Sequence, residues 1–305
     1  MSLPRRIVPG ATYLLTRRIF QRRFLLRPTP EVVAIFNYCL AEAAARFNIR
    51  LIAWCAMSNH YHAVIHDPDG NVPRFTEHFH KMTSKTLNAY YGRWENLWST
   101  EETCVTRLVT PDDVFDKVAY VLSNPVTAHL VAAIEEWPGA SSWELMGKNS
   151  GLVVARPQYY FRKGTKSRMP ATATLLAVAP EGLDEVAYAR WVDRVREEVQ
   201  RRAALSQKIR RQEGIPLVGR DRVLHVDPNE GPSSDATHRK LRPALACKDE
   251  VRMEAEKEIL KEFRRAYYTA RVRFASGVRD AVFPAGTYRL LRTWSVCCTP
   301  FPNTA

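Results

Sequence analysis

Three features are missing from the sequence, and each absence excludes a class of protein. No apolar run approaches the roughly 18 residues that a membrane-spanning helix needs, so we expect no membrane partner. No Walker A or GxGxxG motif occurs, which argues against a bound nucleotide cofactor. No CxxC pair occurs either, which argues against a cysteine-rich zinc module.

The cysteines and the first residues bear on the compartment. The start of the chain, MSLPRRIVPGATYLL, lacks the apolar stretch and small-residue cleavage site of a secretory signal. The scattered cysteines are typical of reduced thiols in the cytosol. These are Cys39, Cys55, Cys104, Cys247, Cys297 and Cys298. We therefore expect a cytoplasmic protein.

Composition and charge indicate a globular chain with a polyanionic partner. The 305 residues are 46% hydrophobic and 25% charged, which is enough for a sizeable core. The net charge is +13 and is unevenly spread. Residues 1–150 hold 16 basic and 14 acidic side chains, whereas residues 151–305 hold 29 and 18. A basic excess of this size suits nucleic acid or an acidic membrane surface.

Residues 1–150 show the pattern of an α+β domain. The alternation and turn signals predict strands at 7–16, 49–57, 60–66 and 106–110. Apolar residues at helical spacing predict helices at 30–47, 73–91 and 111–125. The order β-α-β-β-α-β-α predicts a ferredoxin-like layer, one antiparallel sheet with helices on one face.

Residues 151–305 predict a basic and mainly helical C-terminal region. Charged helices are expected at 183–213 and 248–275. Between them, residues 214–246 are rich in Pro, Gly and Ser and are expected to form an extended linker. The tail at 282–291 is expected to be ordered loop and strand.

His60 and His62 are the first candidates for chemistry. Strand side chains alternate, so these two imidazoles share one face and Tyr61 points to the other. Their spacing of about 7 Å along a strand allows both to bind one divalent ion. His66 lies on the same face. The alternative is a strand surface that happens to carry histidines.

Tyr120 and Asn124 are the second pair. Their i, i+4 spacing places both side chains on one face of the helix that begins at Pro111. Pro125 disfavours helical geometry at Asn124, so the asparagine is expected at the helix end. A packed tyrosine and a capping asparagine are the structural alternative.

The two pairs together resemble a known family. The stretches MSNHYHAVI (57–65) and YVLSNPVTAHLV (120–131) resemble the single-tyrosine HUH transposases, closest to the REP-associated tyrosine transposases. FQRRFLL (20–26) and WPGASSW (137–143) extend the resemblance over about residues 7–145. The sequence departs from the pattern at Ser58, where proline is common, and at 126–129, where a basic residue is missing.

The resemblance implies an activity and a role for each candidate residue. It implies an HUH endonuclease fold and a transposase that nicks and rejoins single-stranded DNA at hairpin-flanked ends. Tyr120 would attack the phosphodiester and form a 5′-phosphotyrosine. His60, His62 and Asn124 would hold Mg²⁺ or Mn²⁺. The partner would be single-stranded or hairpin DNA, with the protein on the bacterial nucleoid when bound.

Arginines are the candidates for contact with the DNA backbone, since guanidinium groups bind phosphate. Two groups stand out, one around the first strand and one near the end of the last long helix: Arg5, Arg6, Arg17, Arg18, Arg22, Arg23, Arg264 and Arg265. A solvated basic edge is the alternative interpretation.

Two other functions stay open at the level of sequence. A domesticated hairpin-binding protein would keep the fold without cutting DNA. An unrelated metal-dependent hydrolase would need acidic ligands beside the histidines, and the nearest are Asp67 and Asp69. The sequence leaves open whether the protein is a monomer or a homodimer, and whether the tyrosine serves its own histidine pair or a partner's.

Overall fold

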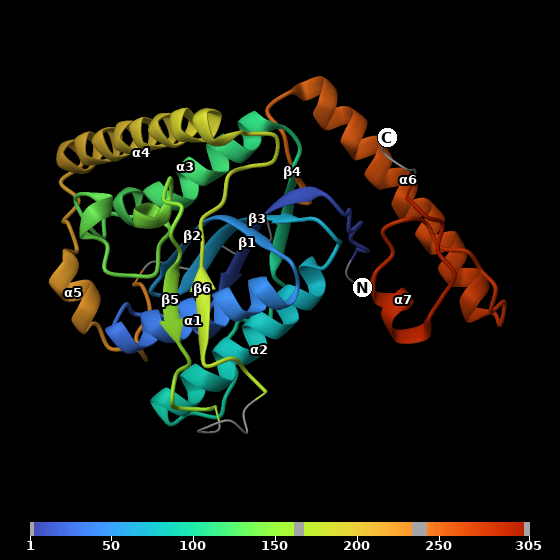
Figure 1. Cartoon of the computed structure of the whole chain (residues 1–305), viewed down its shortest axis with the longest axis horizontal. Helices are drawn as coiled ribbons and strands as arrows, with labels where there is room; N and C mark the ends of the chain where they lie inside the picture. Colours follow the sequence, from blue (N-terminus) through green and yellow to red (C-terminus); the bar gives the residue numbers. More distant parts are fainter. Residues whose placement is uncertain (1–2, 162–167, 234–242, 302–305) are drawn as a thin grey trace.

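A five-stranded sheet lies at the centre of the molecule (Figure 1). The computed structural model describes residues 3–161, 168–233 and 243–301. The sheet has the order β2-β3-β1-β4-β7, and its strands are β1 (Ala11–Arg18), β2 (Arg50–Met57), β3 (His60–Asp67), β4 (Cys104–Leu108) and β7 (Leu245–Ala246). The first four strands pair antiparallel, and β7 pairs parallel to β4. This order confirms the predicted ferredoxin-like α+β fold.

Helices cover both faces of this sheet. The side chain of Tyr61 points toward α1 (Pro30–Arg46) and α2 (Val72–Tyr91), where it contacts Phe36 and Phe79 with ring centroids 5.7 and 5.4 Å away. Its neighbour His62 points the opposite way, toward α3 (Pro111–Thr127). The prediction of helices on one face was therefore wrong. Strands β2 and β3 are buried on both faces and need a helix on each.

Helix α3 begins where the sequence predicted and ends later. The Thr110 hydroxyl accepts a hydrogen bond from the Asp113 backbone N–H, and Asp113 in return accepts from the Thr110 N–H. Pro125 does not end the helix, which runs on to Thr127. The carbonyl groups of this last turn keep partners, since the N–H of Ala128 donates to the Asn124 carbonyl.

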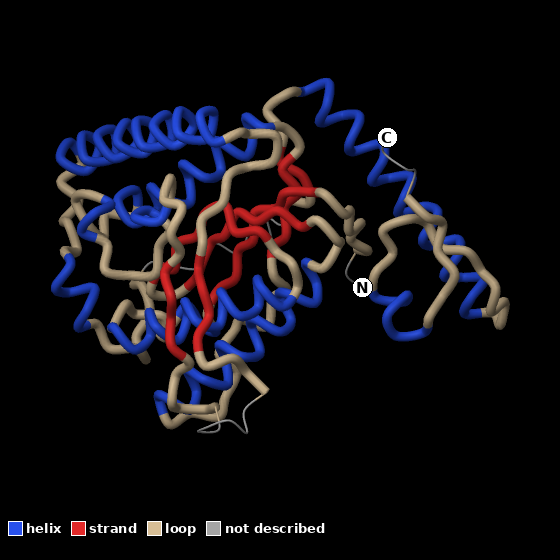
Figure 2. The backbone as a smooth tube through the Cα atoms, viewed as in Figure 1, coloured by secondary structure: helices blue, strands red, loops and turns tan. Residues whose placement is uncertain are grey.

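The second half of the chain packs against the first. The long helix α4 (Glu185–Gln212) lies along α3 (Figure 1). The hairpin of β5 (Leu152–Ala155) and β6 (Thr172–Leu175) packs on α1. Figure 2 shows strands gathered at the centre with helices around them. The division of the chain near residue 150 stays a prediction.

Two predictions for the second half need correction. The segment 214–246 is not simply an extended linker, because it contains α5 (Arg220–His225) and the sheet strand β7, while residues 234–242 lie outside the described residues. The tail is loop followed by α7 (Arg289–Trp294), with a single bridge between Phe283 and Cys298 in place of a strand. The tail folds this way because Phe283 and Val296 pack into a small apolar core with α6 (Glu250–Ala275).

No helix among the described residues combines the length and the apolar composition that crossing a bilayer requires.

Asp116 ties α3 to the second half of the chain. Its carboxylate accepts hydrogen bonds from Arg202 of α4 at 2.8 Å, from Lys248 at 2.9 Å and from Lys117 at 3.0 Å. Burial alone would raise the pKa of Asp116, but these three cationic donors outweigh it and hold the pKa well below its usual range. The backbone N–H of Lys248 also donates to Asp113 at 2.9 Å.

We expect Asp116→Asn to lower the free energy of unfolding by about 1–3 kcal/mol at pH 7, because three donors lose a charged acceptor. A carboxylate whose pKa is depressed in the folded state stabilises that state above its unfolded pKa of about 3.9 and loses this effect as pH falls further. The deficit measured by urea denaturation should thus be equal at pH 7 and pH 5.5. Asp193→Asn, on the exposed face of α4, is the matched control and should change stability by less than about 0.5 kcal/mol. A deficit no larger than this control would contradict the prediction.

Candidate active site

The two predicted histidines lie side by side at the start of β3. The rings of His60 and His62 have centroids 4.9 Å apart and stand nearly perpendicular, at 84°. The β1–β3 register places Arg18 opposite His60 and Thr16 opposite His62. His66 shares this face but lies further along the strand.

One nitrogen of each ring has a partner and the other does not. Nδ1 of His60 donates to Oδ1 of Asn59 at 2.6 Å, and Nδ1 of His62 lies 2.7 Å from the hydroxyl of Thr16. Among the described residues, neither Nε2 has a hydrogen-bond partner. Metal-binding histidines show this arrangement, in which a neighbour orients the ring through its second nitrogen.

Both rings are neutral at physiological pH. Burial, aided by the nearby guanidinium groups of Arg18 and Arg22, lowers the pKa of His60 to about 4. Burial, with His60 and Arg18 nearby, lowers the pKa of His62 well below its ordinary value. Neutral imidazole is the form that binds a metal ion.

Helix α3 brings Tyr120 to the histidines of the same chain. The Tyr120 ring lies edge-on to His62 with centroids 5.2 Å apart and an interplanar angle of 69°. Its side chain is 39% exposed, so a large substrate can reach it. The ammonium of Lys117 lies 5.9 Å from the ring centroid. The structure thus brings together His60, His62 and Tyr120, which are up to 60 residues apart in the sequence.

Asn124 lies one turn beyond Tyr120 on α3. Its amide Nδ2 is buried and has no hydrogen-bond partner among the described residues. A buried N–H donor without a partner costs free energy, so Nδ2 is available to a further acceptor, while a metal ion would be bound by Oδ1.

The residues present fit a divalent metal ion with open coordination sites. The described residues contain no group of three or more His, Cys, Asp or Glu side chains that could hold a metal ion, so the two imidazole nitrogens would need a further ligand such as the Asn124 amide oxygen. This neutral set would bind Mg²⁺ weakly by itself and leave positions for phosphate oxygens.

The acidic residues considered for a hydrolase lie elsewhere. Asp67 is at the far end of β3, where its carboxylate accepts from the backbone N–H groups of Asn71 and Val72 at 2.8 Å. Asp69 accepts from the Asn48 amide at 2.8 Å. Both carboxylates therefore form hydrogen bonds around the turn that precedes α2 and do not lie beside the histidine pair.

The eight candidate arginines divide into separate groups. Arg18 and Arg22 are close enough to the histidines to lower the pKa of His60. Arg17 points to the opposite face of β1, where it donates to the carbonyls of Ser99 and Glu101. Arg23 lines a shallow hollow with Trp94, and Arg265 is exposed on α6.

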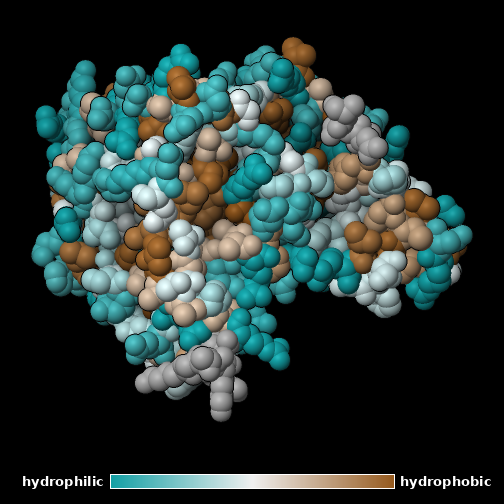
Figure 3. Space-filling view, viewed as in Figure 1, coloured by the Kyte–Doolittle hydropathy of each residue, from teal (hydrophilic) through white to brown (hydrophobic). Residues whose placement is uncertain are grey.

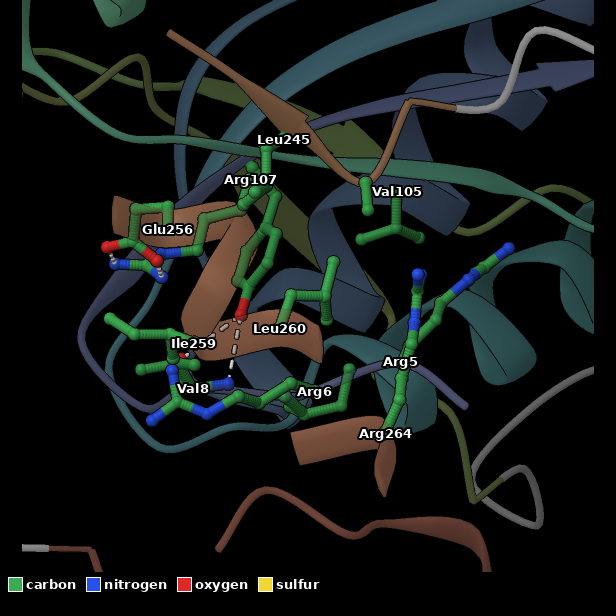
Figure 4. A pocket seen from close by; sticks show the side chains of 13 residues that line it. Arg5, Arg6, Val8, Val105, Arg107, Leu245, Glu256, Ile259, Leu260 and Arg264 are labelled. Carbon is green, nitrogen blue, oxygen red and sulfur yellow. Dashed lines mark hydrogen bonds and ion pairs between the residues drawn. The ribbon is translucent and has the colours of Figure 1, made fainter. Parts of the chain in front are cut away.

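The remaining three arginines line a small cavity between β1, β4 and α6 (Figure 4). Arg5, Arg6 and Arg264 surround this space of about 40 Å³, next to an ion pair of Arg107 and Glu256 at 2.6 Å. Burial and the charge of Arg107 lower the pKa of Arg6. These side chains belong to the junction between sheet and α6 and lie away from the histidines.

Sequence reasoning missed the residues that orient the imidazoles. Asn59 directly precedes His60 and could have been noticed as a hydrogen-bond acceptor. Thr16 is 46 residues before His62, and only the strand register brings them together.

Comparisons with known proteins find similarity among solved structures alone. No family model matches the sequence, and no curated protein matches it. A REP-associated tyrosine transposase bound to a REP hairpin is similar over 47% of this chain and 84% of its own, at 20% identity and a TM-score of 0.40. A candidate transposase from Deinococcus radiodurans is similar over 41% of this chain and 97% of its own, at 19% identity and a TM-score of 0.29. Both of these proteins are described as transposases, the kind of protein that the motifs resemble.

We expect His60 and His62 to bind Mn²⁺ and Thr16 to support them. Electron paramagnetic resonance titration should show Mn²⁺ affinity lost in the His60→Ala/His62→Ala variant. Thr16→Val should weaken binding about 10-fold, because the His62 ring loses its orienting partner, while Thr16→Ser keeps it. His66→Ala is the matched control, since His66 pairs instead with Thr12 at 3.3 Å and Glu181 at 3.5 Å. Unchanged Mn²⁺ binding in the double variant would contradict the assignment.

Proposed function

We propose that the chain is a metal-dependent enzyme that nicks single-stranded DNA and transfers the strand through Tyr120, as a transposase acting on hairpin-flanked ends. The observation that carries this proposal is the contact of the Tyr120 ring with His62, beside a pair of neutral imidazoles with unpartnered Nε2 atoms. Tyr120 and the guanidinium groups of Arg18 and Arg22 lie around this histidine pair. The choice of hairpin-flanked DNA as the substrate rests on the resemblance of the sequence motifs to the REP-associated tyrosine transposases.

In the proposed reaction, the phenolic oxygen of Tyr120 attacks the phosphorus of a phosphodiester. The new bond joins the tyrosine to the 5′ phosphate, and the bond to the 3′ oxygen breaks. The phenol loses its proton to water at the exposed edge of the ring, and the departing 3′ oxygen takes up a proton to become a hydroxyl. The number of phosphoester bonds is unchanged, so the reverse attack by a 3′-OH rejoins a strand without a nucleotide cofactor.

His60, His62 and Asn124 would hold a divalent ion in this scheme. Such an ion polarises a phosphate oxygen and stabilises the charge that develops on it. Arg18 and Arg22 provide positive charge on the same side and orient the phosphate. A tyrosine is a weak nucleophile at neutral pH. In this scheme the protein therefore contributes to the rate mainly by holding the phosphorus atom close to the phenolic oxygen of Tyr120.

Tyr120 and the histidine pair belong to one chain, so a single copy can assemble the whole set. We therefore propose that the tyrosine acts on the phosphate held by its own histidines.

We expect a covalent adduct with DNA that depends on Tyr120 and on a metal ion. The protein is incubated with Mn²⁺ and labelled single-stranded DNA from the flanks of its own gene, with and without the hairpins, and run on a denaturing gel. A retarded band should form, and it should fall about a thousandfold or more in Tyr120→Phe and vanish with EDTA. Tyr90→Phe is the matched control and should leave it unchanged.

Two outcomes would contradict the proposal. A band that persists in Tyr120→Phe would mean that another nucleophile acts. Tight binding of a flanking hairpin without any adduct would favour the alternative function, a hairpin-binding protein that does not cleave.

A further inference from the structure

A groove lies between part of the C-terminal lobe and the rest of the molecule. We define the lobe as residues 263–296, which comprise the second half of α6, α7 and the loops between them. The lobe stands out from the body beside a recess (Figure 3). The groove has a volume of about 880 Å³, and its other wall is formed by the start of α2, by the residues before β1 and β4, and by Arg17 and Val105 within these strands. This space is much larger than the cavity shown in Figure 4.

The lobe wall of the groove alternates aromatic and cationic side chains. Its members are Tyr267, Tyr268, Arg271, Tyr288, Arg289 and Trp294. Trp294 is 63% exposed and Tyr268 is 36% exposed. Tyr267 packs against Phe283 of the small apolar core of the lobe, with ring centroids 5.7 Å apart, whereas Tyr268 and Trp294 do not belong to this core. Large exposed aromatic side chains gathered on one surface mark a binding site.

Positive charge is concentrated in the lobe. Residues 263–296 contain seven arginines and one acidic residue, Asp280. The first half of α6, at 250–262, contains five glutamates and lies outside the lobe. The body wall is mixed, with Glu77, Glu101 and Glu102 beside Arg5 and Arg17. Attraction for a polyanion therefore comes from the lobe side.

The groove reaches the end of β1, and the candidate active site lies at the same end of this strand on the opposite face of the sheet. Arg17 lines the groove, and Arg18 is the next residue of β1 and faces His60 on the other side of the sheet. Consecutive Cα atoms are about 3.8 Å apart, so the end of β1 joins the two regions. Because neighbouring side chains of a strand point to opposite faces, a DNA strand would have to pass around the end of β1 to connect the two regions.

We propose that this groove binds single-stranded DNA, with unpaired bases stacked on Tyr268 and Trp294 and phosphates along the arginines of the lobe. Aromatic rings interleaved with cationic groups are the standard surface for unpaired bases, whose faces are free to stack. In a duplex the bases stack on each other, so their faces are not available to these aromatic rings. The link of this groove to strand cleavage rests on the proposed function, whereas binding in the groove does not.

The test is the affinity of the full chain for a fluorescent 20-nucleotide oligothymidylate, measured by anisotropy. Tyr268→Ala/Trp294→Ala should bind at least about 10-fold more weakly, since each stacked base contributes a factor of about 5 to 150. Tyr268→Phe/Trp294→Phe should bind within about threefold of the wild type. Tyr159→Ala, a 48% exposed aromatic outside the groove, is the matched control and should bind normally. Thermal unfolding of each variant establishes that it is folded.

Mapping by cross-linking makes the test independent of substitutions. An oligonucleotide with 5-iodouracil should cross-link on irradiation to peptides within 266–275 and 288–294. Cross-links confined to other peptides would overturn the proposal, as would wild-type affinity in the double alanine variant. Equal affinity for a duplex of the same length would overturn the assignment to single strands.

Failure of this proposal and failure of the proposed function give different results. Tyr120→Phe should bind the oligothymidylate as the wild type does. Normal binding that depends on the groove, without any covalent adduct, would refute the strand-transfer function alone. A normal adduct together with undiminished binding by the double alanine variant would refute the groove alone.

Discussion

The pairing of β1 with β3 is the constraint on which the site depends. Its register places Thr16 opposite His62 and Arg18 opposite His60, so one strand orients the imidazoles that the other carries. A shift by one residue would turn both histidines into the apolar layer now occupied by Tyr61. The geometry of the site therefore follows from backbone hydrogen bonds that involve none of its side chains.

Helix α3 is the second element that must be fixed, and it is held mainly by residues that are distant in sequence. Arg202 and Lys248 both bind Asp116, one turn before Tyr120. Phe115 packs edge-on to Trp191 of α4, with centroids 6.2 Å apart. The ring of Tyr120 itself is partly exposed, so its position is determined by the packing of its helix rather than by its own burial.

Much of the first half could be predicted from the sequence, because its signals are local. Alternation in HYHAVIH and the proline that opens each of the helices α1 and α3 suffice to place strands and helices within a few residues. The face covered by α3, the role of Thr16 and the joining of β7 to the sheet depend on contacts across 46 residues or more, which no local pattern records. The arginines also show what a local sequence pattern does not record. Their number indicated a polyanion, but only the fold separates Arg18, near the histidines, from Arg17, on the opposite face.

The two edges of the central sheet are protected by different parts of the chain. Along β2, Ser141 forms a bridge to Cys55, and along β4 the neighbour is β7, which comes from residues 245–246. An uncovered strand edge presents free N–H and C=O groups and promotes association between copies. A chain cut near residue 150 would retain His60, His62, Tyr120 and Asn124, yet it would leave β4 bare. The second half of the chain therefore covers this edge of the sheet, which should limit association between copies of the chain.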